Sequence, residues 1–433
     1  MKSRNSDIKT DPGKFWFALD NAAKIFPAIT NNEVTSVIRL TAVLKHPVKI
    51  KQLQKAILQA EKRFSYFRVQ LKEGFFWYYL EHLPQHFPVE ADENVCCRKF
   101  PNGGLLIRFL VRNNTINAEF SHVLTDGSGA LEFFKAVLVL YSGECSAKIS
   151  PEVELNLPVD QISEEEYEDA YNRYFKAEIP PMVKRSKAFH LPYSLKSIPR
   201  FTVRKAIVSL EHIKEVARRK EVSVTVYLTS VYLYILQEIF EGLNKYSTYK
   251  NRKKLRIQVP VNLRNIFPSK TMRNFTLFVM PEIDLRLGHY SFDEIIKSVY
   301  HQTKLETDEK LIHKNISRNV GSERKLFVRG IPLFLKSLIL RIKYYSLGTN
   351  QYSGVLTNLG KIDLPEETGR LIDYFVMTPP PPNKRLKLNC GVAGFGNKLV
   401  LSFGSMTQSV EFEEKFLQFL RDQNISVEWE TTK

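Results

Sequence analysis

Apolar residues recur at two different spacings in the first 115 residues of the chain. Residues 34–44, 74–83 and 104–113 follow the pattern of β-strands. Between the first two, residues 49–64 place their apolar side chains on one side, as in an amphipathic helix. The pattern predicts a sheet with a helix packed against it.

The next alternating segment ends at a histidine. Side chains in residues 116–121 fall on opposite sides of a strand, and His122 follows as its last residue. Two glycines, Gly127 and Gly129, then interrupt the strand pattern. After them the apolar residues follow helical spacing, with Asp126 or Ser128 placed as the N-cap of the helix. We therefore expect His122 at a strand-to-helix junction, where a side chain is held rigidly but points into open space.

The second half of the chain shows the same order of elements as the first. Residues 200–210 predict a strand, 210–221 an amphipathic helix and 222–237 a buried helix, and residues 254–264 and 274–285 predict two further strands. No short sequence repeat is visible. The likeness between the halves is one of architecture.

The segment between the halves differs from both. Residues 150–200 are first acidic and tyrosine-rich and then rich in proline, which is typical of a linker. A chain of 433 residues is also too long for one ordinary core. We expect a first domain at residues 1–180, a linker at 181–200 and a second domain at 201–433.

Composition and charge narrow the class of protein. Hydrophobic residues at 43% and charged residues at 25% are typical of a globular protein. The formal net charge of +17 favours an anionic partner, such as nucleic acid, an acidic membrane or a phosphate-rich cofactor. No nucleic-acid motif accompanies this charge, and the aromatic residues follow core-like patterns, so we expect no nucleic-acid partner.

Cysteine usage and the apolar segments bear on location. Cys96, Cys97, Cys145 and Cys390 form no CxxC pair, and no histidine stands at metal-ligand spacing, so neither a disulfide framework nor a metal site is predicted. The first twenty residues lack the apolar core of a signal peptide. The longest uncharged run, residues 222–237, is shorter than a bilayer span. These features favour a cytoplasmic protein.

The histidine at the junction is a candidate for chemistry. A neutral imidazole at a strand end can accept a proton from a hydroxyl or an amine, as a general base does. Asp126, four residues on, could pair with His122, or turn away and pair with a cation that holds the loop. The HxxxDG pattern alone fits equally well a His and an Asp that merely satisfy a turn.

Two further motifs follow the first in a fixed order. After "SHVLTDG" come "VPVNLRNIFPSKTMRNF" at residues 259–275 and "VLTNLGKIDLP" at 355–365. Together they resemble the superfamily of chloramphenicol acetyltransferase, BAHD acyltransferases, peptide-synthetase condensation domains and alcohol acetyltransferases. Residues 19–29 and 63–81 extend the resemblance over nearly the whole chain, closest to the bacterial alcohol acetyltransferase-like group. BAHD enzymes carry a DFGWG motif, and "DYFVMTPPPP" occupies that part of this chain.

The resemblance implies an α/β fold and a set of site residues. The fold is two chloramphenicol acetyltransferase-like domains, each a mostly antiparallel sheet flanked by helices, with an active-site tunnel between them. By the same likeness His122 is the general base, and Asp126 faces away from substrate in a bidentate pair with Arg264 that ties the domains together.

Three more residues receive roles from this likeness. Gly127 would allow the tight turn that presents the histidine. Thr357 would supply a hydroxyl near the oxyanion, with Asn358 as its competitor. Asn274 and Phe275, by contrast, fit the simple role of ending a strand.

The expected function is transfer of an acyl group, with acetyl as the first expectation, from a coenzyme A thioester to an alcohol. Acyl-CoA is then a co-substrate, and no bound cofactor is expected. A stand-alone condensation-like enzyme would instead use a carrier-protein thioester and an amine or alcohol. A third possibility is a catalytically silent member that only binds ligands. Two domains that share one site suffice as a monomer.

One segment of the second half combines apolar and basic residues. Residues 328–348 read as one helix with Pro332 in its first turn, and Arg329, Lys336 and Lys343 fall on one narrow stripe. Such a helix could lie on an anionic membrane. The alternative, which the broad apolar side favours, is that this side packs against the second sheet while the lysines face water.

Overall fold

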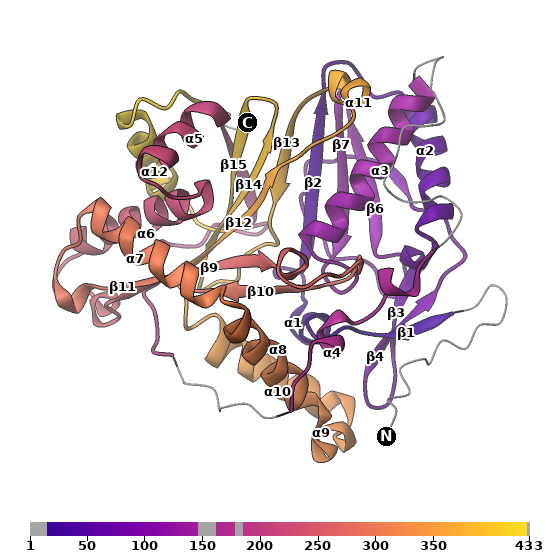
Figure 1. The fold of residues 1–433 in the computed structure, drawn as a ribbon, viewed down its shortest axis with the longest axis horizontal. Coiled ribbons are helices and arrows are strands. Elements are labelled where there is room, and N and C mark those ends of the chain that lie inside the picture. The colour runs from indigo at the N-terminus through magenta and orange to yellow at the C-terminus, as the bar shows by residue number, and fades with distance from the viewer. Residues whose placement is uncertain (1–14, 146–161, 178–184, 431–433) are drawn as a thin grey trace.

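Two β-sheets stand side by side in the molecule, and helices pack against each of them (Figure 1). The structure is a computed structural model, and it describes residues 15–145, 162–177 and 185–430. Most strand pairs in both sheets are antiparallel. The α/β fold with two helix-flanked sheets is confirmed.

The first sheet has five strands in the order β13-β2-β7-β6-β5. Its strands are β2 (Val37–Leu44), β5 (Val89–Ala91), β6 (Ile107–Arg112), β7 (Thr115–Ser121) and β13 (Ile372–Thr378). Every residue of β2 is buried, because neighbouring elements cover both faces of this part of the sheet.

Two helices cover one face of the first sheet, α2 (Ile50–Arg63) and α3 (Gly127–Cys145). The apolar face predicted for α2 is buried against the sheet through Leu53, Ala56, Ile57 and Ala60. Because α3 also contacts α2, its apolar residues are buried on several sides, which suits a helix within the core.

The second sheet follows the order β10-β9-β12-β14-β15-β8-β16, with β11 beside β9. Proline at position 281 has no backbone N–H, and the strand expected at residues 274–285 is divided there into β10 and β11. The strands are β8 (Thr202–Ser209), β9 (Lys254–Asn262), β10 (Thr276–Val279), β11 (Glu282–Asp284), β12 (Gly354–Lys361), β14 (Leu388–Phe395), β15 (Lys398–Ser405) and β16 (Val427–Glu430).

Four helices pack against the second sheet and its neighbours. The helices are α5 (Leu210–Arg219), α6 (Val224–Gly242), α7 (Phe292–Glu306) and α12 (Glu411–Asp422). The buried helix expected at residues 222–237 is α6, and Ser223 caps its N-terminus by accepting a hydrogen bond from the Val226 N–H. Thirteen of its nineteen residues are buried, so α6 is the central helix of the second core.

A third, smaller sheet and most of the remaining helices lie at the lower edge of the molecule, whereas α11 lies at the upper end, in contact with α3 (Figure 1). The sheet has the order β1-β4-β3. These elements are β1 (Trp16–Ala18), β3 (Val69–Glu73), β4 (Tyr78–His82), α1 (Phe26–Ile29), α4 (Ala170–Arg173), α8 (Glu309–Arg324), α9 (Leu326–Gly330), α10 (Leu333–Lys343) and α11 (Glu366–Leu371).

One strand of the first sheet comes from the second half of the chain. Strand β13 lies far along the sequence but pairs with β2, so the first sheet contains a strand from the second half of the chain. Residues 185–194 of the expected linker run beside the second core, into which Phe189 and Leu191 are packed. Residues 1–14, where no signal peptide was expected, and residues 181–184 of the linker lie outside the described residues. The boundaries themselves stay a prediction.

The segment at residues 328–348 differs from both of its predicted arrangements. It is not one helix, because the helical conformation is interrupted at Ile331 and Pro332, between α9 and α10. Lys336, expected in water, is buried, while Phe334 and most other apolar residues of α10 are exposed. The expectation that this apolar side packs against the second sheet is therefore wrong.

In the described part of the chain, no single helix is long and apolar enough to cross a bilayer. The pair α5 and α6 reaches the required length and hydropathy only when taken together, and the two helices are bent by 83° relative to one another.

Candidate active site

His122 lies where the sequence placed it. Strand β7 ends at Ser121, and the His122 N–H donates to the Ser36 carbonyl at 2.8 Å. Asp126 rather than Ser128 caps α3, since Asp126 Oδ1 accepts hydrogen bonds from the Ser128 N–H at 3.1 Å and the Gly129 N–H at 2.9 Å. The turn between strand and helix is thus anchored on both sides of the histidine.

Two side chains from distant parts of the chain fix the imidazole ring. Its Nδ1 lies 2.9 Å from Asn274 Oδ1, and its face stacks on the ring of Phe26 with centroids 4.4 Å apart. Asn274 Nδ2 in turn donates to Asp20 Oδ2 at 3.0 Å and to the His122 carbonyl at 3.1 Å. Asn274 and Asp20 are both buried, so these contacts are shielded from water.

The partners of Asn274 decide which ring nitrogen of His122 carries the proton. The Asp20 carboxylate and the His122 carbonyl are both acceptors, so the amide NH₂ of Asn274 must face them. The amide oxygen then faces Nδ1, which can only donate to it. In the neutral ring Nε2 therefore keeps its lone pair, and the structure describes no hydrogen-bond partner for Nε2 among its residues.

The environment of His122 favours this neutral form. Burial lowers the pKa of the imidazole below its usual value of 6.5, and this effect outweighs the opposing influence of Asp126, Asn274 and Asp20, which favour the cation. A neutral imidazole with one nitrogen fixed and the other free is the form that can accept a proton.

Asp126 faces away from the imidazole and holds three segments together. Besides its two N-capping bonds, its Oδ2 accepts from Arg264 Nη1 at 2.9 Å, the Phe275 N–H at 2.8 Å and Thr276 Oγ1 at 2.8 Å. Burial raises the pKa of Asp126, but the charge of Arg264 and the backbone hydrogen bonds outweigh it, and the net pKa is below its usual value. The predicted contact with Arg264 is present.

The predicted bidentate geometry of that contact is wrong. Only Nη1 of Arg264 reaches Asp126, and the same nitrogen donates to Asn262 Oδ1 at 3.0 Å. The other nitrogens donate to backbone carbonyls, Nε to Thr271 at 2.8 Å and Nη2 to Arg273. Arg264 therefore shapes residues 271–273, the loop that delivers Asn274 to the histidine.

Glycine is needed in this turn for space, not for a positive φ. Gly127 is the first residue of α3 and is not among the positive-φ glycines, and its expected role of allowing the tight turn stays a prediction. A Cβ on Gly127 would lie 3.1 Å from Leu359 of β12. At Gly129 a Cβ would lie 2.1 Å from the Met272 carbonyl oxygen, a clash with backbone that only glycine avoids.

The structure separates the two oxyanion candidates on β12. Asn358 points toward α6, where its Nδ2 donates to Thr225 Oγ1 at 3.0 Å, and its Oδ1 accepts from the Gly360 N–H at 2.8 Å. Leu359 packs against the first core, next to Gly127. Thr357, in a partly exposed position of the same strand, precedes Asn358 and so lies on the opposite strand face, toward the first domain.

Sequence reasoning missed three residues of this site, Asp20, Phe26 and Asn274. Asp20 and Phe26 belong to the segment at residues 19–29, whose resemblance to the family was noted without assigning a role. Asn274 was interpreted as a strand end. Its contact with His122 joins positions 152 residues apart, and no spacing rule along the chain predicts such a contact.

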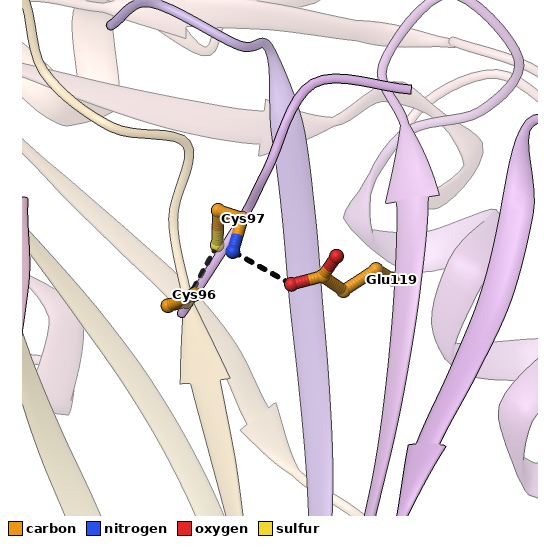
Figure 2. A group of neighbouring side chains, drawn as sticks. All are labelled: Cys96, Cys97 and Glu119. Carbon is orange, nitrogen blue, oxygen red and sulfur yellow. Dashed lines mark hydrogen bonds between the residues drawn. The ribbon is translucent and has the colours of Figure 1, made fainter. Parts of the chain in front are cut away.

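One group of potential metal ligands lies elsewhere in the first domain. Ligand atoms of Cys96, Cys97 and Glu119 lie within 4.8 Å of one another, and the Cys97 N–H donates to Glu119 Oε1 at 2.6 Å (Figure 2). Arg39 and Arg108 also donate to the two oxygens of Glu119, at 2.8 and 2.7 Å. Two guanidinium groups already balance this carboxylate and would repel a cation, so the arrangement does not favour metal binding.

Three of the four basic side chains at residues 251–256 make contacts within the protein, those of Arg252, Lys254 and Arg256. Arg256 is almost fully buried and pairs with Glu282, and Lys254 Nζ lies 2.6 Å from the same carboxylate. These residues line a surface cavity of about 570 Å³ on the second domain. The expected tunnel between the domains stays a prediction, because neither this cavity nor a small one beneath α10 is lined by His122.

Solved structures of two kinds illustrate what this chain superposes on. TRI101 of F. sporotrichioides, solved with coenzyme A and T-2, matches with a TM-score of 0.62 at 10% identity, over 96% of this chain and 99% of that chain. The condensation domain of the Monacolin K polyketide synthase MokA matches with a TM-score of 0.57 at 13% identity, over 94% and 96%. The chain therefore has the fold shared by condensation domains and chloramphenicol acetyltransferase-like enzymes.

A third structure supports the same assignment of fold. TRI3 trichothecene 15-O-acetyltransferase of Fusarium sporotrichioides matches with a TM-score of 0.60 at 10% identity, over 96% of both chains. No protein-family model matches the sequence, and no curated protein matches it. Identities this low establish the fold alone, so the activity has to be argued from the site.

Proposed function

We propose that this protein is an acyltransferase that moves an acyl group, with acetyl as the first candidate, from a coenzyme A thioester to an alcohol, with His122 as general base. The observation that carries this proposal is the state of the imidazole. Asn274 Oδ1 accepts a hydrogen bond from Nδ1–H, burial keeps the ring neutral, and Nε2 is left with its lone pair.

In the proposed reaction, His122 Nε2 removes the proton from the acceptor hydroxyl as its oxygen attacks the thioester carbonyl carbon. The resulting tetrahedral oxyanion is stabilised by a hydrogen bond from the Thr357 hydroxyl. The intermediate then collapses and breaks the carbon–sulfur bond, and the imidazolium returns its proton to the leaving thiolate. The base is regenerated, and no covalent acyl-enzyme forms.

Asp126 and Arg264 act as positioning residues in this scheme. Their contacts hold the turn that presents His122 and the loop that presents Asn274. The fold similarity to TRI101 and TRI3, whose structures are described as a coenzyme A complex and as an O-acetyltransferase, supports a thioester donor and an alcohol acceptor.

A second candidate uses a carrier-protein thioester as donor and an amine or an alcohol as acceptor. The fold similarity to condensation domains favours this alternative. The same general base serves both reactions, since an amine and a hydroxyl each lose a proton during acyl transfer.

Thiol release with a matrix of donors and acceptors tests the proposal. Acyl-CoA thioesters of several chain lengths and a carrier-protein thioester are each combined with a panel of alcohols and amines. We expect CoA release that depends on an alcohol. Release only from the carrier-protein donor would select the second candidate, and no acceptor-dependent release from any donor would contradict both.

Two variants make the assay specific to the site. His122→Ala removes the proposed base and should abolish acceptor-dependent release. His301→Ala alters an exposed histidine of α7 and serves as the matched control, for which an unchanged rate is expected.

A further inference from the structure

Large apolar side chains gather at one edge of the molecule. Leu326 is 84% exposed, Phe334 69% and Phe75 73%. Nine of the twenty exposed large hydrophobic residues found in the described ranges belong to this one surface, which we call the apolar ridge. The ridge consists of Phe75, Phe76, Leu326, Phe327, Phe334, Leu335, Leu338, Ile339 and Ile342.

The ridge is built from three segments that are locked together. Figure 1 shows α9 and α10 at the lower edge of the molecule, which the hairpin between β3 and β4 also reaches. The Leu333 N–H donates to the Phe75 carbonyl at 3.0 Å, which attaches the start of α10 to the tip of that hairpin. Phe75 and Phe76 pack edge to face at the tip, with centroids 4.7 Å apart. The apolar side chains therefore form one surface.

Helix α10 turns a lysine inward and its large apolar residues outward. Lys336 Nζ lies 3.8 Å from the centroid of the Trp77 ring and donates to the carbonyls of Phe76 and Arg329 at 3.0 and 3.1 Å. These contacts replace water around the ammonium group. Phe334 and Leu338 lie four residues apart and share the outward face. The exposure of these apolar residues follows from a fixed orientation of the helix.

The charge along α9 and α10 has one sign, and the β3–β4 hairpin adds one exposed carboxylate, Glu73, two residues before Phe75. Residues 324–348 contain no Asp or Glu, and Lys325, Arg329, Arg341 and Lys343 are exposed. A second copy of this chain would bring the same cations against the ridge, so repulsion disfavours self-association. An anionic surface that also accepts apolar side chains complements both features.

We propose that the apolar ridge docks the protein on an anionic phospholipid membrane surface. The exposed phenylalanine and aliphatic side chains insert among the lipid head groups, and the surrounding cations bind lipid phosphates. This mode differs from the expected cationic stripe, because Lys336 takes no part in it. It goes beyond the proposed function and does not depend on it.

The docked face lies next to the candidate active site. Helix α10 packs against α1, and Arg341 Nε donates to the Ala28 carbonyl of that helix at 3.0 Å. Phe26, the first residue of α1, stacks on His122. Docking would therefore place the candidate catalytic histidine within two helices of the membrane surface, where a lipid-like acceptor or acyl chain would be present.

Co-sedimentation with vesicles tests the proposal without any substrate. The full chain is mixed at low salt with vesicles of phosphatidylcholine alone or of equal parts phosphatidylcholine and phosphatidylserine. We expect binding to the anionic vesicles that weakens as salt is added. A protein that stays in the supernatant with both vesicles would overturn the proposal.

Matched variants separate the ridge from the general positive charge. The triple variant Leu326→Ser, Phe334→Ser, Leu338→Ser changes only exposed side chains and should weaken binding at least about tenfold. Its control, Tyr246→Ser, Leu287→Ser, Leu305→Ser, removes three exposed side chains elsewhere and should bind as the unaltered protein does. Equal binding by the two triple variants would contradict the role of the ridge.

Sedimentation velocity without lipid tests the competing occupant. We expect the protein to be monomeric with and without the ridge substitutions. A dimer that dissociates in the ridge variant would show that the ridge is an interface between copies, and the membrane proposal would then be wrong.

Discussion

Two histidines of this protein sit in similar surroundings and differ in one hydrogen bond. Burial lowers the pKa of both, that of His190 to about 4. His190 uses both ring nitrogens, with Nε2 2.9 Å from the Thr349 carbonyl and Nδ1 3.1 Å from Arg252 Nη1. His122 has a partner for Nδ1 alone among the described residues.

This difference distinguishes a histidine with a structural role from one that can act as a base. Arg252 can only donate, so Nδ1 of His190 must accept, and Nε2 carries the proton and donates to the Thr349 carbonyl. No lone pair is left on that ring for a substrate. In His122 the fixed proton is on Nδ1 and the lone pair of Nε2 remains available. Burial and a lowered pKa are therefore poor evidence of function until both ring nitrogens have been accounted for.

Replacing each of the two histidines by alanine gives the largest expected difference in the rate of thiol release. His122→Ala removes the proposed base and should lower the rate of thiol release about 10²- to 10⁴-fold. His190→Ala should lower the melting temperature and leave the rate per folded molecule unchanged. Kinetics together with thermal denaturation of both variants measures this. Equal rates of thiol release in the two variants would contradict the assignment of different roles to His122 and His190.

Asp126→Ala tests whether the turn that holds His122 depends on a buried charge pair. Removing this carboxylate strands Arg264 and should cost about 3–5 kcal/mol in the free energy of unfolding, and activity falls with it. The exposed pair of Asp363 with Lys361 gives the control, since Asp363→Ala should cost less than about 1 kcal/mol. Chemical denaturation at pH 7 compares the two.

The pH dependence of that stability gives a second check on Asp126. Because its folded pKa lies below the usual 3.8, the carboxylate stabilises the protein above that pH. The contribution disappears as the pH falls through the lowered value. The stability difference between the unaltered protein and Asp126→Ala should therefore shrink in acid. A difference that stays constant would contradict the assigned ion pair.

Thr357→Val tests whether Thr357 and Nε2 of His122 belong to one reaction site. Loss of one oxyanion donor should lower kcat about 100-fold while the fold is kept, since valine has nearly the same shape as threonine. Asn358→Leu is the matched control on the opposite face of β12, and it should affect stability more than kcat. Unchanged kcat in Thr357→Val would remove this residue from the mechanism.

Asn274 gives the smallest and most specific effect. Asn274→Ala frees the imidazole to take the other tautomer, and we expect the rate to fall about tenfold. The hydrogen bond to Asn274 favours the imidazolium, so Asn274→Ala should also lower the pKa of His122 further. A merely structural asparagine would lower stability without moving the pH profile.

The pH–rate profile measures the change in the pKa of His122. The unaltered protein should lose activity only below pH 6.5, because acid protonates His122 and its pKa is lowered by burial. In Asn274→Ala the acid limb should move to lower pH, because a hydrogen bond that favours the imidazolium is lost. Stability should follow a related dependence on pH. The unfolded state takes up a proton at position 190 below pH 6.5, so the folded state should weaken between pH 6.5 and about 4. His190→Gln should remove the part of this loss that is due to His190, and the part due to His122 should remain.

Local pattern determined much of this protein. Period-2 and period-3.6 spacing predicted β2, β4, β6 to β9, α2, α5 and the buried α6, because these signals reflect which face of one element is covered. Strands β1, β3, β5 and β12 to β16 were not predicted. The same alternation predicted His122 at the end of a strand, and the resemblance that the three ordered motifs carry implied the contact of Asp126 with Arg264.

Only the tertiary structure decided the residues that act on His122 from a distance. Asp20, Phe26 and Asn274 reach it across long stretches of chain, and β13 crosses into the first sheet, because packing joins segments that no local periodicity relates. The orientation of α10 is the clearest case. Hydropathy predicted its apolar side inward, but the aromatic face and carbonyls that receive Lys336 come from the β3–β4 hairpin and from α9, so the cation is buried and the apolar residues face outward.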